Sequence, residues 1–179
     1  KFGGKALLTS KDHRSGTERV QEVANQLDFS LNDIVVNVQG DEPLIPPAAI
    51  DIVAAALNEK KEFGIATLCE SATEGIENPN IVKVVMNSFG EALYFSRSPM
   101  PYSSKSNNYF RHIGLYAYRV DALNQFVNFP ASICEDSENL EQLKALDFGL
   151  KIHVTVCEFN IPPGVDTPKD LNAVRALIP

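Results

Sequence analysis

The sequence predicts an α/β fold in three layers, with helices on both faces of a mixed, mostly parallel β-sheet and an inserted β-hairpin. A near-continuous run of β-branched residues at 34–38 is typical of a strand covered on both faces, and such strands mostly occur in parallel sheets. Strand-like and helix-like segments alternate along the chain, which favours an α/β arrangement. Two strand-like segments flank the turn-like tetrad at 87–90 and predict the hairpin.

The first part of the chain predicts two strands and two helices: a strand at 6–9, a helix at 17–27, a strand at 34–39 and a helix from Pro47 onward. Apolar residues recur at helical spacing in the first helix. Ser15 and Glu18 at its start have the spacing of a capping box. Proline suits the first turn of a helix, because the N–H groups of that turn have no partner within the helix.

The rest of the chain predicts a buried strand at 65–69, hairpin strands at 82–86 and 92–96, a strand at 110–118, a helix through 140–146, a strand at 150–156 and a last helix from Pro168. His153 and Thr155 share the polar face of the strand at 150–156, so we expect His153 to be solvated. Since no repeat or linker divides the chain, we assign residues 1–179 to a single domain.

Composition excludes several classes of protein. The formal net charge of the 179 residues is −7, which argues against a nucleic-acid-binding protein, because that function needs a basic face. A nucleotide substrate is still compatible, since Mg²⁺ and a few basic residues can neutralise phosphates. The three cysteines show no metal-finger spacing and favour a reducing, cytoplasmic setting. No apolar run is long enough to cross a membrane.

Two aspartates follow strand-like segments at distant points of the chain. Asp41 comes directly after the strand at 34–39, and Asp166 precedes the helix that begins near Thr167. Ligands of parallel sheets bind beyond the carboxyl ends of the strands, and carboxylates are preferred ligands of Mg²⁺. Taken singly, Asp166 is explained as well by the preference of acidic residues for a helix N-terminus. A magnesium site therefore requires the fold to bring the two aspartates together.

For several other polar residues the sequence allows both a functional and a purely structural interpretation. The small-residue turn at 12–19 either binds an anion or a base edge with its amides or is only a capped helix start. Alternation in the strand at 110–118 places a histidine, a glycine and two tyrosines on one face, which suits a sugar site or an aromatic ladder. Arg97 either grips a carboxylate or lies on the surface. Glu141 and Gln142 border a cleft or are solvated.

Six motifs in a fixed order are more specific than any of these residues alone. They are HRSGTER at 13–19, VNVQGDEP at 36–43, YFSR at 94–97, RHIG at 111–114, LEQL at 140–143 and GVDTP at 164–168. Over nearly the whole chain, this series resembles the 3-deoxy-manno-octulosonate cytidylyltransferases, or CMP-Kdo synthetases. The resemblance implies a nucleotide-diphospho-sugar transferase-like fold and a homodimer. It also implies that CTP and the acidic sugar Kdo react to give CMP-Kdo and pyrophosphate for lipopolysaccharide biosynthesis.

The resemblance also implies roles for individual residues. Asp41 and Asp166 would be the catalytic residues that bind Mg²⁺. The cytidine of CTP would be bordered by Ser15, Gly16 and Arg19. The sugar site would be lined by Gln39, Arg97, His112, Tyr116, Glu141 and Gln142.

The sequence departs from the family pattern at its front. The family begins with a strand and a loop containing glycine, arginine and lysine that holds the CTP phosphates, whereas this chain opens at Lys1 without such a loop. We therefore expect the domain to be N-terminally incomplete and the 179-residue polypeptide to be inactive by itself. Two other functions stay open: a cytidylyltransferase for amino-Kdo or a sialic acid, and a non-catalytic sugar- or nucleotide-binding module.

Overall fold

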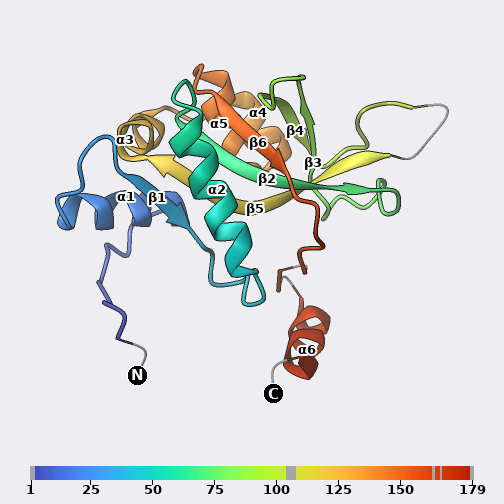
Figure 1. Ribbon diagram of the computed structural model, residues 1–179, viewed down its shortest axis with the longest axis horizontal. Coiled ribbons are helices and arrows are strands. Elements are labelled where there is room, and N and C mark those ends of the chain that lie inside the picture. The colour runs from blue at the N-terminus through green and yellow to red at the C-terminus, as the bar shows by residue number, and fades with distance from the viewer. Residues whose placement is uncertain (1–2, 104–107, 163, 166, 178–179) are drawn as a thin grey trace.

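The computed structural model describes residues 3–103, 108–162, 164–165 and 167–177 (Figure 1). Its strands are β1 (Ile34–Asn37), β2 (Ile65–Ala72), β3 (Lys83–Met86), β4 (Ala92–Ser96), β5 (Tyr109–Arg119) and β6 (Ile152–Val156). Its helices are α1 (Gly16–Gln26), α2 (Pro47–Glu59), α3 (Val120–Asn128), α4 (Ile133–Glu138), α5 (Gln142–Asp147) and α6 (Pro168–Leu177). Within these residues, no helix combines the length and the apolar character needed to cross a membrane.

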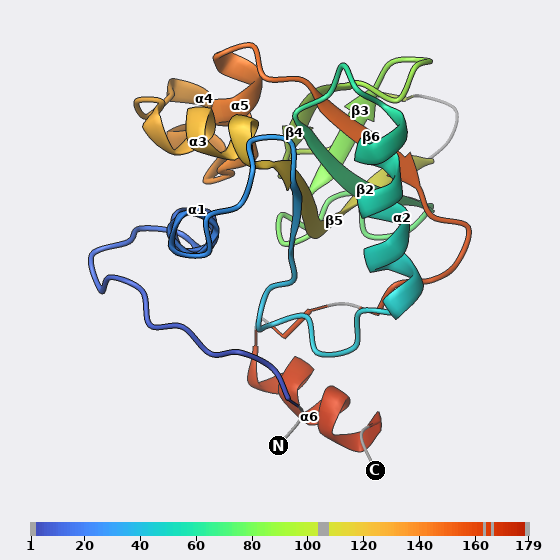
Figure 2. The same cartoon turned by 60° about the vertical axis from the view of Figure 1, so that its left-hand side comes forward.

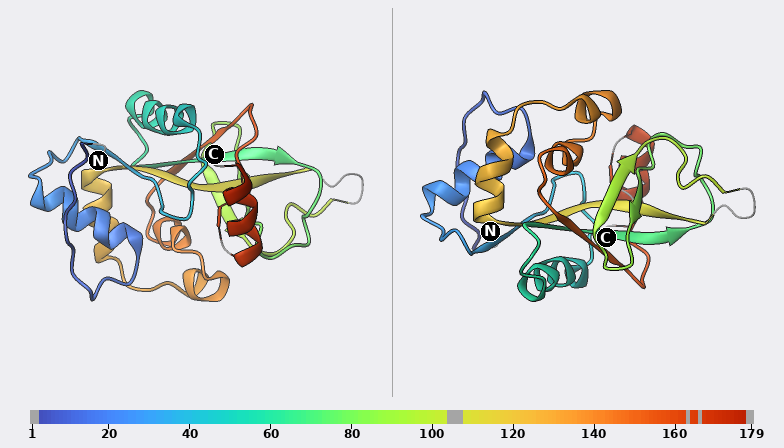
Figure 3. Two further views of the ribbon diagram at one scale, coloured as in Figure 1. Left: turned by 90° about the horizontal axis from the view of Figure 1, so that it is seen from below. Right: turned by 90° about the horizontal axis from the view of Figure 1, so that it is seen from above.

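Helices cover both faces of the sheet and confirm the three-layer prediction (Figure 3). On one face, α2 packs Val53 and Leu57 against β2 and β5. On the other face, α3 and α5 contribute Leu123, Phe126 and Leu143 to a second apolar cluster, and α1 packs against its margin. Helix α6 lies apart from the sheet in Figures 1 and 2.

The sheet is mixed, as predicted. Strands β1, β2, β3 and β6 run in one direction, and β4 and β5 run in the other. Although four of these strands share one direction, most neighbouring strands are antiparallel, so the prediction of a mostly parallel sheet is wrong for the pairing. Among the described strands the β2–β6 ladder is parallel and the others are antiparallel, because β5 runs through the centre against its neighbours.

Strand β5 is the element on which the site is built, because its partner changes along its length. Strand β2 pairs with one side of β5 from Tyr109 to Tyr118. On the other side, β3 pairs with Arg111 and β1 pairs with Tyr116. Residues 112–115 therefore lie between two ladders, and the register with β2 shifts at this point. Such bulges redirect side chains and are common beside functional sites.

The predicted hairpin is confirmed, and its tip changes the environment of His153. Gly90 adopts φ 77° at the tip and accepts a hydrogen bond from the N–H of Val154 at 2.7 Å. A side chain at Gly90 would clash with His153, because its Cβ would lie 2.6 Å from Cε1. His153 is buried at 9 % exposure and packs on Phe63 at 5.0 Å. The expectation that His153 is solvated is wrong, because the hairpin closes over β6.

The strand predicted at 6–9 is absent from the described chain. This segment runs outside the sheet in Figure 2, so it has no neighbouring strand with which to form a ladder. The predicted starts of the first helix, α1, and of the last helix, α6, are confirmed. Ser15 caps α1 by accepting a hydrogen bond from the N–H of Glu18, and Thr167 and Asp170 cap α6 reciprocally.

Lys83 holds together the chain segments on either side of the hairpin. Its side chain has 0 % exposure, and Nζ donates to the carbonyl oxygens of Asn78 at 2.9 Å and Arg97 at 2.6 Å. Burial lowers the pKa of this amine, and nearby Glu77 and Glu138 oppose that shift. The ammonium group is therefore kept in the core by two main-chain acceptors.

Replacing Lys83 by methionine should lower the free energy of unfolding by about 2–3 kcal/mol, because two carbonyls lose a charged donor. Urea denaturation followed by circular dichroism measures the change. Lys151→Met is the matched control: Lys151 is exposed and pairs with Glu91 at 3.3 Å, so its loss should cost less than about 1 kcal/mol. Equal costs for the two variants would contradict the role assigned to Lys83.

Candidate functional site

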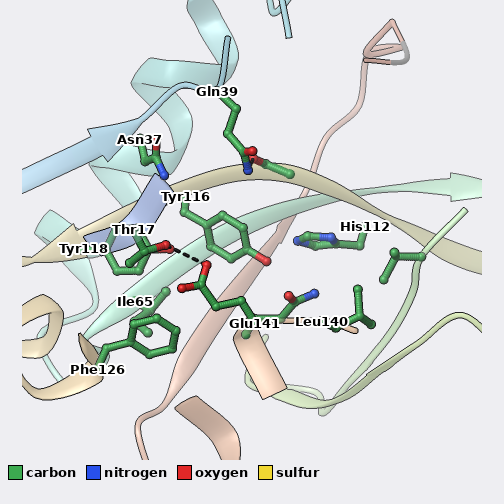
Figure 4. A pocket seen from close by; sticks show the side chains of 13 residues that line it. Thr17, Asn37, Gln39, Ile65, His112, Tyr116, Tyr118, Phe126, Leu140 and Glu141 are labelled. Carbon is green, nitrogen blue, oxygen red and sulfur yellow. Dashed lines mark hydrogen bonds between the residues drawn. The ribbon is translucent and has the colours of Figure 1, made fainter. Parts of the chain in front are cut away.

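A cavity of about 220 Å³ opens where β5 changes partner (Figure 4). Its walls come from α1, β1, β2, β5, α3 and the segment before α5. The lining residues are Thr17, Asn37, Gln39, Ile65, Val82, His112, Gly114, Tyr116, Tyr118, Phe126, Leu140, Glu141 and Gln142. Five of the six residues predicted for a sugar site are therefore brought together here, from three distant parts of the chain.

Gln39 reaches this cavity because β1 ends at Asn37 and the chain leaves the sheet there. The side-chain Nε2 of Gln39 donates to the carbonyl oxygen of Gly114 at 3.4 Å. Gly114 lies within the bulged part of β5, where β1 and β3 both stop pairing. The end of one ladder thus places an amide side chain opposite an exposed main-chain carbonyl.

Glu141 is positioned by a residue of α1. The hydroxyl of Thr17, which is 3 % exposed, donates to Oε2 of Glu141 at 2.9 Å (Figure 4). Burial raises the pKa values of the Tyr116 and Tyr118 phenols, and the Glu141 carboxylate adds to both shifts. Both phenols therefore remain protonated and can donate hydrogen bonds.

His112 lines the same cavity beside Tyr116. Its Nε2 is 3.0 Å from the hydroxyl of Thr67, and its ring packs edge-on against Phe95 and tilted against Tyr116. Burial lowers the pKa of His112 to about 3, and the neighbouring Arg111 guanidinium acts in the same direction. The imidazole is neutral at physiological pH. Amides, phenols, a neutral imidazole and one carboxylate together suit a ligand with several hydroxyl groups.

A second cavity of about 440 Å³ adjoins the first at His112 and Gly114 and extends to Glu42 and Asp170. Here the turn after β1 meets the segment before α6. The N–H of Val165 donates to the carbonyl oxygen of Asp41 at 2.8 Å. A Cβ on Gly164 would lie 3.0 Å from the Glu42 carboxylate, so glycine permits this close approach.

This contact bears on the predicted magnesium site. The main chain brings Asp41 next to Val165, whereas Asp166 lies outside the described residues. Asp41 and Glu42 carry carboxylate oxygens, which are the type of ligand that Mg²⁺ prefers. Among described residues, no group of three His, Cys, Asp or Glu side chains could hold a metal. The shared metal site stays a prediction.

The residues predicted to contact cytidine lie at the start of α1. Ser15 is its N-cap, and Gly16 is its first residue and faces the amide of Asn37. The guanidinium of Arg19 donates to the Thr9 hydroxyl at 2.9 Å and to the carbonyl of Ser10 at 2.8 Å. Arg19 thus ties the preceding segment to α1. Contact of these residues with a nucleotide stays a prediction.

Arg97 is the predicted sugar-site residue that does not line the cavity. Its guanidinium donates to the carbonyl oxygens of Pro79, Glu138 and Asn139 at 3.0, 2.9 and 3.4 Å. Glu138 in turn accepts from the N–H of Arg97 at 2.8 Å. These bonds hold the chain just before Glu141, so Arg97 supports the cavity wall. Its contact with a sugar carboxylate stays a prediction.

Sequence reasoning missed three residues that build the site: Thr17, Asn37 and Thr67. Thr67 had a detectable signal, because it is the one polar residue in the otherwise apolar segment 65–69. Thr17 had none, since a threonine in the first turn of a helix is ordinary. Its partner Glu141 is 124 residues away.

Comparison with known proteins first defines the class. A putative glucose-1-phosphate thymidylyltransferase from Bacillus anthracis, solved with sucrose, aligns with a TM-score of 0.53 over 88 % of this chain and 59 % of that one. At 18 % identity, this similarity shows the fold alone. The mixed sheet between two helical layers is thus the nucleotide-diphospho-sugar transferase-like fold that the sequence predicted.

Closer relatives define the family. A sequence model described as cytidylyltransferase matches residues 1–152. A 3-deoxy-manno-octulosonate cytidylyltransferase from Pseudomonas syringae pv. tomato is 50 % identical over 99 % of this chain and 75 % of its own length. The same enzyme from Saccharophagus degradans is 49 % identical over 98 % and 74 %. The chain therefore belongs to the 3-deoxy-manno-octulosonate cytidylyltransferases of the cytidylyltransferase family, which confirms the resemblance.

A solved structure adds a nucleotide complex to this set. The CMP:2-keto-3-deoxy-manno-octonic acid synthetase complexed with CTP aligns with a TM-score of 0.91 and 41 % identity. The match covers 98 % of this chain and 73 % of that one. The structural comparison and the sequence comparison therefore indicate the same class of enzyme.

The low pKa of His112 predicts a contribution to acid sensitivity. An unfolded histidine takes up a proton as the pH falls through 6.5, whereas folded His112 stays neutral to about pH 3. The unfolded state binds more protons in this window, so the stability present at neutral pH decreases as the pH falls. Between about pH 7 and about pH 5.5, wild type should lose roughly 1 kcal/mol more unfolding free energy than His112→Gln. Urea titrations at both pH values measure this difference, and parallel losses would contradict it.

Proposed function

We propose that this chain supplies the site that transfers the cytidylyl group of CTP to the anomeric hydroxyl of Kdo, giving CMP-Kdo and pyrophosphate for lipopolysaccharide biosynthesis. The observation that carries the proposal is the 41 % identity and TM-score of 0.91 with a synthetase solved in complex with CTP. The cavity beside the Asp41 turn supports it, because its polar lining, neutral apart from Glu141, suits a sugar with many hydroxyl groups.

The transfer needs positioning more than covalent participation of the protein. The anomeric oxygen forms a bond to the α-phosphorus as the bond from that phosphorus to the bridging oxygen breaks. Pyrophosphate leaves with the electron pair of that bond, and the hydroxyl loses its proton. In this proposal Gln39, His112, Tyr116, Glu141 and Gln142 orient the sugar.

The nucleotide lies on the α1 side of the site in this proposal, next to Ser15, Gly16 and Arg19. Thr17 supports the assignment, because its hydrogen bond to Glu141 joins the start of α1 directly to the sugar-binding wall. Nucleotide and sugar would then be held by two parts of one connected structure.

Asp41 and Asp166 would hold Mg²⁺. The contact between Val165 and Asp41 supports this role, because it joins the two chain segments that carry these aspartates. When bound, the ion would neutralise phosphate charge and favour the deprotonated sugar hydroxyl as the attacking group. The family resemblance supports a homodimer. The cysteine pattern supports a cytoplasmic location.

Pyrophosphate release in the presence of CTP, Kdo and Mg²⁺ tests the function. The assay should use the 179-residue chain and a chimera that adds the part of the Pseudomonas syringae relative that this chain does not match. Turnover is expected in the chimera. Asp41→Asn should reduce its kcat/KM roughly a hundredfold or more and abolish Mg²⁺-dependent CTP binding.

Asp51→Asn is the matched control, because Asp51 is an exposed residue of α2 and should leave turnover unchanged. Magnesium-independent sugar binding without pyrophosphate release would indicate a binding module. A higher kcat/KM for amino-Kdo or a sialic acid would assign a different acidic sugar.

A further inference from the structure

The hydroxyl of Thr67 occupies an unusual position inside the sheet. Thr67 has 0 % exposure and lies at the register shift between β2 and β5. Its Oγ1 is 3.1 Å from the carbonyl oxygen of Ile113 and 2.9 Å from that of Leu115. The same oxygen is 3.0 Å from Nε2 of His112. One hydroxyl therefore serves three polar atoms at the bulge beside the cavity.

The Thr67 hydroxyl has a single proton, and this decides which group donates in each of these hydrogen bonds. A threonine hydroxyl carries one proton and can also accept hydrogen bonds, whereas a carbonyl oxygen can only accept. Two carbonyls compete for the Thr67 proton, and a buried carbonyl without a donor is destabilising. The hydroxyl consequently donates to the main chain and accepts from His112. Nε2 of His112 is the protonated nitrogen.

The other ring nitrogen of His112 must then lack a proton. Burial and the neighbouring Arg111 keep the imidazole neutral, with a pKa of about 3. Neutral imidazole carries a single N–H, so Nδ1 is an acceptor. In the described chain, the buried polar side-chain atoms without a partner are Nδ1 of His153 and Oγ1 of Thr155. Nδ1 of His112 is not among them, which agrees with its access to the cavity that the ring lines.

We infer that Thr67 is a positioning residue that holds His112 in the Nε2–H form, so that Nδ1 accepts a hydrogen bond from a hydroxyl group of the sugar. The identity of the ligand rests on the proposed function. An acceptor nitrogen repels a carboxylate, whose oxygens are also acceptors. His112 therefore recognises a hydroxyl of the acidic sugar, and the sugar carboxylate binds elsewhere.

Nitrogen-15 NMR of the 179-residue chain, labelled at histidine, tests the protonation state without any ligand. The chain has three histidines, and His112→Gln identifies the signals of His112. Wild type should show a protonated Nε2 and an unprotonated Nδ1 at neutral pH. A protonated Nδ1 would overturn the inference. Thr67→Ser should preserve the wild-type pattern, whereas Thr67→Val should give a mixture of the two neutral forms.

Steady-state kinetics of the chimera test the consequence for the sugar. Thr67→Val should raise the KM for Kdo about tenfold, because a correctly oriented hydrogen bond is lost. Its kcat and its KM for CTP should stay within about twofold of wild type, and Thr67→Ser should restore the KM for Kdo. Thr155→Val is the matched control, since it removes a strand threonine hydroxyl away from His112. An unchanged KM in Thr67→Val would overturn the positioning role.

Sugar analogues identify the group that His112 recognises. Replacing one particular hydroxyl by hydrogen should weaken binding to wild type and weaken it less in Thr67→Val. Removing the carboxylate charge should have the same effect in both proteins. A carboxylate effect that depends on Thr67 would overturn the inference. Absence of turnover with Kdo in the wild-type chimera would refute the proposed function, while the NMR experiment would still decide the protonation state of His112.

Discussion

The site depends on one constraint, which is that β5 must exchange β3 for β1 as its partner without losing buried hydrogen bonds. Residues 112–115 fall between the two ladders, and the bulge there would leave main-chain carbonyls unpaired in the sheet. The Thr67 hydroxyl lies against two of them, and Gln39 donates to a third at Gly114. The carbonyls beside Thr67 are buried, and an unpaired buried carbonyl is destabilising, so Thr67 stabilises the register shift beside the cavity. The cavity is thus a consequence of how the sheet is completed.

The geometry of the site also depends on hydrogen bonds between elements that are far apart in the sequence. Thr17 joins α1 to Glu141, and Val165 joins the last part of the chain to Asp41. Each contact links two segments that the proposed function uses for different substrates or for the metal. Because each is a hydrogen bond between well-separated segments, a shift of α1 or of the chain near 165 would alter the geometry of the site.

Cations around the site mainly hold the chain in place. Lys83 and Arg97 donate to main-chain carbonyls, and Arg111 pairs with Glu70 at 2.7 Å and donates to Ile161. The described part of the 220 Å³ cavity has a neutral lining apart from Glu141. This distribution supports a division of labour in which loops are held by basic residues, sugar hydroxyls meet neutral groups, and phosphate charge is met by the proposed metal ion.

Local pattern by itself determined helices α1, α2, α5 and α6, the hairpin, the mixed sheet and the two faces of β5, because apolar periodicity and turn residues act over a few positions. Helices α3 and α4 were not predicted from the sequence. It also determined the family, because six ordered motifs carry that information. Tertiary structure decided which neighbour each strand received. It therefore decided that residues 6–9 form no strand, that His153 is buried beneath Gly90, and that Arg97 holds carbonyls behind the cavity. It also decided the roles of Thr17 and Thr67, because a hydrogen bond across 124 residues or across a bulge depends on which segments the fold brings into contact, and no local spacing encodes that.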